Sequence, residues 1–575
     1  RYEKRVEGDA LVTRAILVDD GSDTLEWVET WDVMGRTEKT VYPDGAQSLQ
    51  FYDSAGRLEK TVDPDGVVNL YAYNSKGERY QTAVDVNQND EIDDIANTAD
   101  RVSERATFFT TRTYEGETYA VYRSESFQWT ESGRVSVSIS DRTPDGKHVW
   151  NERFGSIAYT FTEDANTTDG DWKVTSVAPD GSYNVQTYTD GRMSDTTSYD
   201  STGAQLASTT ILFDALGRQE YITDSRTGTT QITYYDNDAV ASRIAPDPDG
   251  DTLDTQGSVV QHPDGDGTHD PLETTFIYDD MGRQTQVILP DATSTYTEYN
   301  AKGQVVKTYG SQQNPVEYTY DYAGRQKTMT TWQDFDVSTG FGISGDATTT
   351  WIYDNQRGWL DRKEYPAVAP DPAYGTDYTY TPGGRLASRT WARGIDTLYA
   401  YNSAGDILAV DYDDAGATPD IHYTYARTGQ QDAVSEGQYA TAAFSAGDIF
   451  TPSLSPSLST SVRSIDHDYN DRFQVQLETI TGLLANDKEL VRTYVESGST
   501  VGRNAGYIFG ELLATTANPL GASDFATTHS VVDYGYDAAG RLETVTDGTD
   551  TFTYGYLADT RNLLETVTGP VHDVT

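Results

Sequence analysis

The amino-acid sequence predicts an all-β protein built as one long antiparallel sheet of β-hairpins. Three observations predict it: the composition, a motif that recurs at a fixed spacing, and two turn signals in each repeat. The 575 residues include 41 Tyr, 16 Phe, 9 Trp, 49 Gly and 19 Pro. Aromatic and β-branched side chains suit a pleated strand, whereas Gly and Pro suit turns. Only 36% of the residues are hydrophobic, but so many aromatic residues are atypical of a disordered chain.

A six-residue motif recurs along the chain: an aromatic residue, Asp or Asn, two variable residues, Gly and often Arg. Successive copies at Trp31, Tyr52 and Tyr73 begin 21 residues apart. Copies begin at Trp31, Tyr52, Tyr73, Tyr199, Phe213, Tyr278, Tyr299, Tyr320, Tyr380, Tyr401, Tyr412 and Tyr536, with degenerate copies at Trp129 and Tyr353. A fixed period indicates a repeat architecture. We therefore do not expect the separate domains, one per roughly 150 residues, that the length alone would suggest.

Each period contains a second turn signal. The strings Pro43-Asp44-Gly45, Pro64-Asp65-Gly66 and Pro290-Asp291 each begin eight residues after the Gly of the motif. Pro suits the first central position of a type I turn, and Gly suits its exit. Residues 58–62, between two turns, alternate in polarity as a strand does. Each repeat is therefore predicted to be a β-hairpin. Because an isolated hairpin is marginally stable in water, neighbouring hairpins should pair edge to edge.

These copies resemble YD repeats, also called Rhs repeats, named for a Tyr-Asp pair such as Tyr52-Asp53 or Tyr536-Asp537. Proteins with such repeats include bacterial polymorphic toxins, the cocoon components of insecticidal toxin complexes, and teneurins. The resemblance implies a strip of sheet that spirals into a hollow shell or tube. It also implies a function in enclosure or surface display, without catalysis by the repeats themselves.

The sequence divides into segments of one continuous shell rather than independent domains. YD repeats are expected at residues 1–80, 105–245, 272–428 and 531–575. Between them lie an acidic insertion at 81–104, an Asp-rich loop at 246–271, and divergent strands with a loop insertion at 429–530. In this last region we expect strands near residues 473–481 and 490–496, although residues 483–495 also carry the best helical spacing in the chain.

The acidic insertion places oxygen-bearing side chains at alternate positions, as calcium-binding loops do. The candidate calcium ligands are Asp85, Asn87, Asn89, Glu91 and Asp93. The stretch looks like an EF-hand or dockerin-type loop, which implies Ca²⁺ as a bound ion. It departs from that pattern at Asp90, where Gly is expected, and at Ala96, where an acid is expected. Asp94 or Asp100 would have to supply the missing carboxylate, and a plain solvated acidic loop is the alternative.

The Asp-rich loop at residues 246–271 has little apolar content and is expected to be exposed. Its spaced carboxylates are also compatible with calcium chelation, although carboxylates among Gly and Pro are more often simply solvated.

No catalytic signature is present in the sequence. It lacks the G-x-S-x-G, H-E-x-x-H and G-x-x-x-x-G-K-[ST] patterns, and its seven His are dispersed. Cysteine is absent, which excludes disulfides, thiolate zinc sites and cysteine nucleophiles. The string Asp466-His467-Asp468 mimics part of an acid–base site, but we interpret it as a surface salt-bridge group. The chain is therefore not expected to be an enzyme.

Charge limits the possible partners. The 42 Lys and Arg against 91 Asp and Glu give a net charge of −49, which repels a phosphate backbone and argues against nucleic acid. No apolar run approaches the roughly 18 to 20 residues of a membrane span. Because the sequence begins at Arg1, without an initiator Met or a signal peptide, we expect a processed product or a piece of a longer chain.

Toxin-type members of the resembled family end their shell with an Asp-Pro-x-Gly-Leu region that cleaves itself and frees a C-terminal toxin. The nearest string here, at residues 63–67, stands at an ordinary repeat position and is expected to be a turn. This puts self-cleavage and a carried toxin in doubt for this segment.

The leading hypothesis is a structural shell or scaffold segment of a large secreted or cell-surface protein, of bacterial or archaeal origin. Its expected partners are neighbouring repeats of the same longer chain or further copies, together with an enclosed polypeptide cargo. One alternative is an adhesin that binds cell-surface glycans through exposed Tyr and Trp. Another is the cocoon of a polymorphic toxin whose toxin domain lies outside this chain.

Overall fold

A computed structural model describes most of the chain. It describes all residues except 1, 8–9, 19–23, 33, 97, 165–170, 247–251, 254–258, 261–271, 337, 367–374, 415, 441–442, 452–455, 471, 482–487, 495–511, 520–529, 538–540, 548–549, 557–563 and 571–575. Every regular element among the described residues is a β-strand. None of them forms a helix that is long and apolar enough to cross a membrane.

The strands are short and follow one another closely. The first are β1 (Tyr2–Glu7), β2 (Ala10–Val18), β3 (Thr24–Trp31), β4 (Thr37–Val41), β5 (Gln47–Tyr52), β6 (Leu58–Val62), β7 (Val68–Tyr73), β8 (Arg79–Val84), β9 (Arg101–Tyr114), β10 (Glu117–Thr130), β11 (Gly133–Arg142), β12 (His148–Arg153), β13 (Ser156–Asp164), β14 (Trp172–Val177), β15 (Tyr183–Thr189) and β16 (Arg192–Tyr199). The next are β17 (Gln205–Phe213), β18 (Gln219–Asp224), β19 (Gly228–Tyr234), β20 (Val240–Ala245), β21 (Thr252–Leu253), β22 (Val259–Val260), β23 (Leu272–Tyr278), β24 (Gln284–Ile288), β25 (Ser294–Tyr299), β26 (Val305–Gly310), β27 (Gln313–Tyr320), β28 (Gln326–Thr331), β29 (Asp334–Asp336) and β30 (Phe341–Ser344). The last are β31 (Ala347–Tyr353), β32 (Leu360–Glu364), β33 (Gly375–Tyr380), β34 (Leu386–Thr390), β35 (Asp396–Asn402), β36 (Ile407–Asp413), β37 (Asp420–Tyr425), β38 (Gln431–Gln438), β39 (Ile449–Phe450), β40 (Thr460–Tyr469), β41 (Val475–Thr481), β42 (Lys488–Tyr494), β43 (Leu512–Pro519), β44 (Ser530–Tyr536), β45 (Leu542–Asp547), β46 (Asp550–Tyr556) and β47 (Leu564–Thr568).

Forty-three of these strands belong to a single sheet. Each strand pairs antiparallel with the next one along the chain, as β5 pairs with β6 and β6 with β7. Two small hairpins, β21–β22 and β29–β30, stand outside this sheet. Strand β39 departs from the pattern because it pairs parallel with β35. The predicted fold class, a continuous antiparallel strip of hairpins, is confirmed.

The motif forms a tight turn with a bulge. In the copy at Tyr52, the amide of Gly56 donates to the carbonyl of Asp53 at 2.9 Å, and Gly56 has a φ of 83°. The β5–β6 register shifts by one residue at Tyr52, which a glycine in the left-handed region allows. The Asp53 carboxylate accepts the amide of Arg57 at 2.8 Å and its Nε at 2.7 Å. The same Asp–Arg arrangement recurs at Asp32, Asp214, Asp279, Asp321 and Asp537.

In many repeats, the Tyr that precedes the motif turn links the repeat to the previous one. The guanidinium of Arg57 lies 4.6 Å from the ring centroid of Tyr73, and the Tyr73 hydroxyl donates to the carbonyl of Leu58 at 2.9 Å. The same hydroxyl bond to the strand that follows the previous copy is made by Tyr52, Tyr234, Tyr299, Tyr320, Tyr353, Tyr380, Tyr401, Tyr425, Tyr469 and Tyr556. The period of the sequence is therefore the spacing of a hydrogen-bond ladder along the strip.

The second turn of each repeat also has the predicted geometry. The amide of Gly45 donates to Tyr42 at 2.9 Å, and the amide of Gly66 donates to Asp63 at 3.0 Å. Gly66 has a φ of 84°. The string at residues 63–67 is thus a repeat turn, as the sequence predicts.

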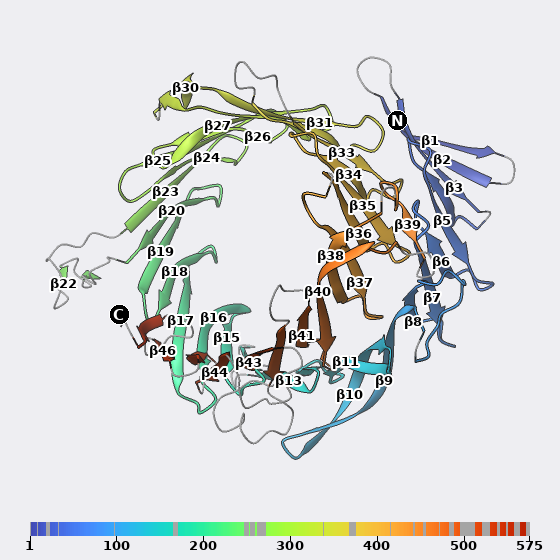
Figure 1. The fold of residues 1–575 in the computed structure, drawn as a ribbon. Coiled ribbons are helices and arrows are strands. Elements are labelled where there is room, and N and C mark those ends of the chain that lie inside the picture. The colour runs from blue at the N-terminus through green and yellow to red at the C-terminus, as the bar shows by residue number, and fades with distance from the viewer. Residues whose placement is uncertain are drawn as a thin grey trace.

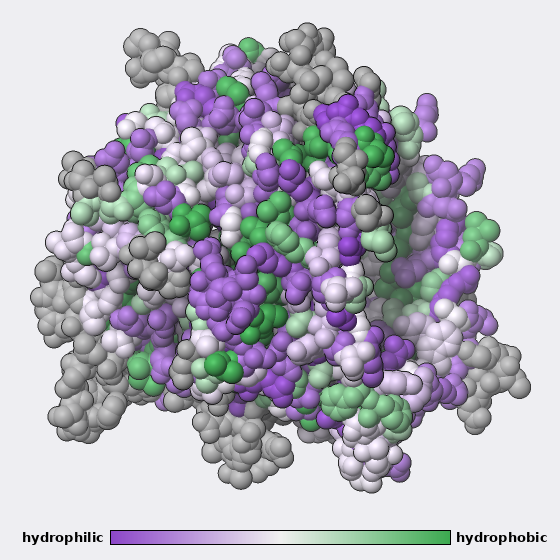
Figure 2. Space-filling model, turned by 90° about the vertical axis from the view of Figure 1, so that its right-hand side faces the viewer, coloured by the Kyte–Doolittle hydropathy of each residue, from purple (hydrophilic) through white to green (hydrophobic). Residues whose placement is uncertain are grey.

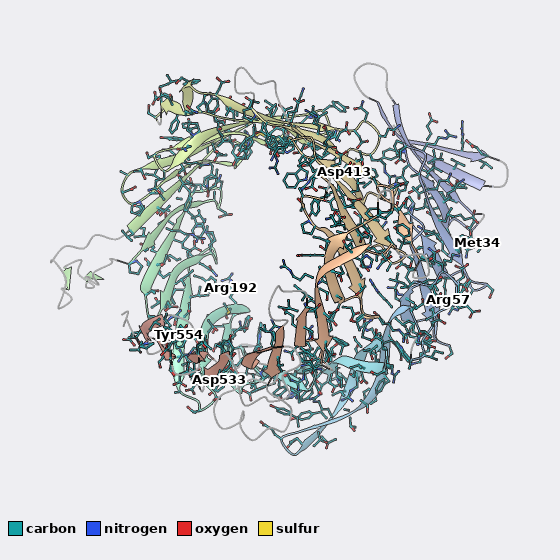
Figure 3. All side chains as sticks on the ribbon, in the orientation of Figure 1. Met34, Arg57, Arg192, Asp413, Asp533 and Tyr554 are labelled. Atoms are coloured by element: carbon teal, nitrogen blue, oxygen red, sulfur yellow. The ribbon has the colours of Figure 1, made fainter. Side chains whose placement is uncertain are left out.

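The strip curls into a ring around an open middle and then overlaps itself (Figure 1). We call β1 to β28 the first winding and the strands from β31 onward the second winding. In Figure 1, β33 to β38 lie beside the strands β5 to β8 of the first winding. The side chains drawn in Figure 3, including the labelled Arg192 and Asp413, follow the wall and leave the middle of the ring open. The side of the molecule in Figure 2 is mostly hydrophilic, with hydrophobic residues scattered between.

A single-layer sheet provides little interior, and the buried apolar residues form small clusters. One cluster lies on β7 to β9 and consists of Val68, Leu70, Ala83 and Val102. Another forms where the segment after β38 crosses the sheet, because Tyr439 and Phe444 of that segment pack on Ala400 and Ala409. Much of the cohesion of the strip therefore comes from its hydrogen-bond ladder.

The helical spacing at residues 483–495 produces no helix over its described part, residues 488–494. Residues 488–494 form β42, which pairs with β41 on one side and β43 on the other. Pairing with two neighbouring strands outweighs the weak helical preference of these residues, because strand propensity depends on the surroundings of a segment. The strand expected near residues 473–481 is β41, and residues 482–487 lie outside the described part of the chain.

The structure describes the three predicted insertions to different extents. The acidic insertion is the loop between β8 and β9. Within the Asp-rich loop at 246–271, β21 and β22 form a hairpin with two residues in each strand, and all seven of its Asp residues lie outside the described residues. Residues 452–455 of the expected loop at 451–458 also lie outside them.

Candidate functional site: the seam between the windings

The strip has two different rims. In an antiparallel strip, successive turns lie at opposite ends of the strands. The motif turns at residues 32–36, 53–57, 279–283, 321–325, 381–385 and 402–406 therefore share one rim, which we call the motif rim. The turns at residues 42–46 and 63–67, and the loop at 85–100, share the other, which we call the Pro-Asp-Gly rim.

The second winding sets its motif rim against the Pro-Asp-Gly rim of the first winding, and we call this contact the seam. Its hydrogen bonds join residues 296 to 334 positions apart in the sequence. At its first contact, the Arg357 guanidinium lies 3.7 Å from the ring centroid of Tyr42 and its Nε lies 3.5 Å from Asp44. Further along, the rings of Phe154 and Phe473 meet edge to face at 5.6 Å. The seam therefore runs along several consecutive repeats.

Asp65 is an enclosed carboxylate of the seam, with a side chain 1% exposed. It accepts hydrogen bonds from the Thr381 hydroxyl at 2.7 Å, the Gly383 amide at 2.6 Å and the Arg385 guanidinium. Arg385 also binds Asp63 at 2.9 Å. Burial works against the charge of Arg385, but its hydrogen bonds to Asp65 and Asp63 outweigh burial and raise its pKa above the ordinary value.

Arg385 can reach across the seam because its own turn lacks the motif carboxylate. Thr381 stands where the other copies carry Asp or Asn. In intact copies, such as Asp53 and Arg57, the Arg is held within its own turn. In this copy, where the acid is lost and the Arg is kept, the guanidinium binds two carboxylates of the other winding.

Arg427 makes a different contact from the turn that follows Tyr425, where Ala426 stands in place of the motif acid and Arg427 occupies a variable position of the motif. Arg427 is 5% exposed. Its guanidinium donates to four backbone carbonyls of the first winding. These belong to Asp100 at 2.7 Å, Ile95 at 2.6 Å, Thr130 at 3.1 Å, and Asp93. Burial among neutral carbonyls lowers the pKa of Arg427, although nearby carboxylates act in the opposite direction. Arg427 fastens the acidic insertion to the second winding.

Two further bonds complete this part of the seam. The Ser403 hydroxyl donates to the carbonyl of Val86, and Arg101 forms an ion pair with Asp406. Sequence reasoning did not identify any seam residue as a contact. The available signal was the loss of the motif acid in two turns of the repeat, at Thr381 after Tyr380 and at Ala426 after Tyr425.

The structure brings most of the candidate calcium ligands into one loop. The buried Asp85 carboxylate accepts the amides of Asn89 at 3.1 Å and Asp90 at 2.8 Å. Asp93 accepts the side-chain amides of Asn87 at 2.7 Å and Asn89 at 3.3 Å. Glu91 is exposed, and its backbone amide donates to the Asn89 side chain.

Asp100, the possible substitute ligand, lies beneath this loop and is fully buried. It accepts the amides of Val86 at 3.0 Å and Asp93 at 3.1 Å. Burial raises its pKa, and the charges of Asp85 and Asp93 add to that effect. Among the described residues, no three His, Asp or Glu side chains form a metal-binding group. Calcium binding at this loop remains a prediction.

The Asp466-His467-Asp468 string does not assemble an acid–base relay. Asp466 accepts from Ser464 at 3.1 Å, and Asp468 accepts from Gln476 at 3.1 Å. The buried Nδ1 of His467 has no hydrogen-bond partner. The ring borders a polar cavity of about 360 Å³ beside the seam. The absence of enzymatic activity remains a prediction.

Comparison with known proteins gives a weak structural similarity. No protein-family model matches the sequence, and no curated protein matches it. The chain is similar to two crystal structures, of TcdB2-TccC3-TEV and of TcdB2-TccC3, each at 14% identity and a TM-score of 0.48. These matches cover 98% of this chain and 30% and 31% of those chains. The Photorhabdus luminescens Tc holotoxin pore matches at 13% identity and a TM-score of 0.46, over 98% of this chain and 30% of that chain.

The chain thus spans about a third of the length of the solved structures that it resembles. Similarity at this level assigns no function, so the fold rests on the strand pairing described above.

Proposed function

We propose that this chain is a wall segment of a larger YD-repeat protein, secreted or displayed at a cell surface, that encloses a polypeptide cargo. The seam is the observation that carries the proposal. The two rims of the strip differ, and the motif rim of the second winding binds the Pro-Asp-Gly rim of the first. Further windings that stack in the same way would extend the strip into a wall. The net charge of −49 keeps such a large β surface soluble.

The expected partners are further windings, supplied by neighbouring repeats of the same longer chain or by further copies. The motif rim of the first winding supports this, because it carries exposed apolar side chains at one equivalent turn position. Met34, Leu216 and Met281 are 76%, 73% and 73% exposed. Isolated exposed apolar side chains are common, but a recurring position on one rim is consistent with continued stacking.

Single-particle electron microscopy of the purified chain tests the proposal. We expect a ring with an open middle and overlapping ends. A compact globule, or separate domains joined by linkers, would contradict a role as a wall.

The toxin-cocoon version of this function depends on sequence outside the chain. A downstream Asp-Pro-x-Gly-Leu region followed by a variable domain in the full gene would support it. A full gene that encodes only further repeats would instead support a structural surface protein.

A second candidate function is glycan binding, favoured by one surface hollow. A hollow of about 430 Å³ on β24 to β26 is lined by Tyr296, Tyr309, Gln286 and Glu298. The Tyr296 and Tyr309 rings stack at 4.9 Å and an angle of 17°, and both lie outside the motif. Binding on a glycan array that is lost in Tyr309→Ala and kept in Tyr322→Ala would support an adhesin, and an array without hits would exclude it.

A further inference from the structure

The hairpin of β9 and β10 is the longest in the described chain, with 14 residues in each strand. Strand β8 pairs with β9 only over residues 101–104. Strand β11 pairs with β10 only from Tyr122 to Thr130. From residue 105 to Tyr114, β10 is the one described strand that pairs with β9. Ten residues of β9 therefore present a backbone edge that no other described strand pairs with.

The two faces of this hairpin have different surroundings. On one face, the Tyr114 ring lies 4.6 Å from the ring of Tyr159, and Arg112 forms an ion pair with the buried Asp141. On the other face, Phe109 and Tyr122 are 59% and 57% exposed, and their rings meet edge to face at 5.2 Å. The packed face fixes the hairpin against the sheet, so its free edge is a rigid surface feature. Figure 1 shows the hairpin reaching past its neighbours at the bottom of the ring.

This edge lacks the features by which proteins usually protect an edge strand. Natural edges carry Lys or Pro, bulges or short strands, because unpaired N–H and C=O groups form a template for another strand. Residues 105–114 contain no Lys, Pro, Asp or Glu. The β9–β10 register also runs without a shift. The only charged residues of this edge are Arg105 and Arg112. A long and regular edge without Lys, Pro or a bulge in a native protein indicates an interface.

We propose that the β9 edge pairs with the β9 edge of a second copy of this chain, antiparallel across a two-fold axis. An antiparallel register that sets Phe109 opposite its own copy also sets Thr107 opposite Thr111 and Arg105 opposite Thr113. Aromatic and Thr–Thr cross-strand pairs are favourable, and no like charges stand directly opposite. Such an isologous contact closes as a dimer.

Charge limits where on its surface a second copy can approach. Two copies that each carry a net charge of −49 repel one another over most of their surfaces. The β9 edge is a stretch of ten residues without a carboxylate, where a second copy approaches with the least local repulsion. Because that repulsion is screened by salt, dimerisation should strengthen as ionic strength rises.

The test is the molar mass of the purified chain, measured by sedimentation equilibrium over a range of concentrations at moderate salt. We expect twice the monomer mass for the wild type. The double variant Thr107→Lys/Thr111→Lys sets four ammonium groups across the axis and should weaken the dimer at least 100-fold. The matched control Thr319→Lys/Thr379→Lys changes exposed threonines on β27 and β33, which have neighbours on both sides, and should leave the dimer intact.

A crosslink provides a second readout that does not depend on affinity. The chain has no cysteine, so Phe109→Cys introduces a single thiol at the centre of the proposed contact. Mild oxidation should give a covalent dimer, whereas Thr319→Cys should stay monomeric. A wild type that is monomeric at every concentration, a Lys variant that dimerises like the wild type, or masses that grow beyond the dimer would overturn the proposal.

Discussion

At Asp411, burial opposes a charged carboxylate. Burial raises its pKa to about 6, and the neighbouring charges of Asp420 and Asp413 act in the same direction. Asp420 is 3% exposed and accepts the amides of Tyr412 at 3.0 Å and Tyr439 at 2.8 Å. These bonds hold the Asp420 carboxylate beside Asp411.

This pair predicts a pH dependence of stability. The pKa of Asp411 is higher in the folded chain than in the unfolded one, so the folded state binds more protons between about pH 4 and pH 6. Stability should therefore fall as the pH rises through that interval and then level off. Asp411→Asn should remove this slope and stabilise the chain at pH 7 by roughly 2 kcal/mol. Urea unfolding at pH 4.5 and pH 7 measures it, with the exposed Asp346→Asn as control. An equal slope in both variants would contradict the assignment to Asp411.

At the scale of the element, the repeat is a hairpin with its own internal bonds. The Asp–Arg pair fastens the turn, and the Tyr hydroxyl fastens each turn to the previous strand. These bonds are local and recur with the sequence period, so the motif predicts them residue by residue. They also explain why the structural interpretation of the motif residues is preferable to a sugar-binding one.

The Tyr hydroxyl bond has a measurable contribution. Tyr73→Phe keeps the stacking of Arg57 on the ring and removes only the bond to the Leu58 carbonyl. We expect a loss of about 1 kcal/mol, as for a partly buried neutral hydrogen bond. Hydrogen exchange of the β6–β7 amides measures this local change. The control is Tyr322→Phe, whose side chain is 63% exposed. Equal protection in wild type and Tyr73→Phe would show that the ladder does not stabilise the strip.

The acidic insertion carries the prediction of calcium binding. Buried Asp85 and Asp100 lie near Asp93, and a divalent cation would offset their mutual repulsion. At about 1 mM Ca²⁺, a concentration typical of extracellular sites, we expect measurable binding heat and about 1 kcal/mol of added stability. Asp85→Asn/Asp93→Asn should abolish the heat, and Asp291→Asn, in a distant turn, should not. Titration calorimetry without any heat would leave a plain hydrogen-bonded loop.

At the scale of the whole molecule, sequence reasoning predicts what repeats and misses what occurs once. The fold class, the two turns per period and the edge-to-edge pairing follow from local patterns such as those at Tyr52 and Pro64. The seam joins residues about 300 positions apart, and its register depends on the accumulated curvature of many hairpins. No single window of sequence contains that curvature. The one local trace of the seam is the loss of the motif acid at Thr381 and Ala426.

The last prediction concerns the seam as the closure of the ring. Arg385→Ala leaves Asp65 buried without its cation, which costs about 2 to 4 kcal/mol, and Arg427→Ala leaves four carbonyls without their donor. The double variant should keep its strands, because these side chains lie between windings and not within hairpins. Its ring should open, and its maximum dimension in small-angle X-ray scattering should increase while its circular dichroism stays constant. Arg283→Ala is the matched control, because Arg283 binds Asp279 within its own turn and Asn300 beside it. If both variants scatter like the wild type, the windings are held by something other than the seam.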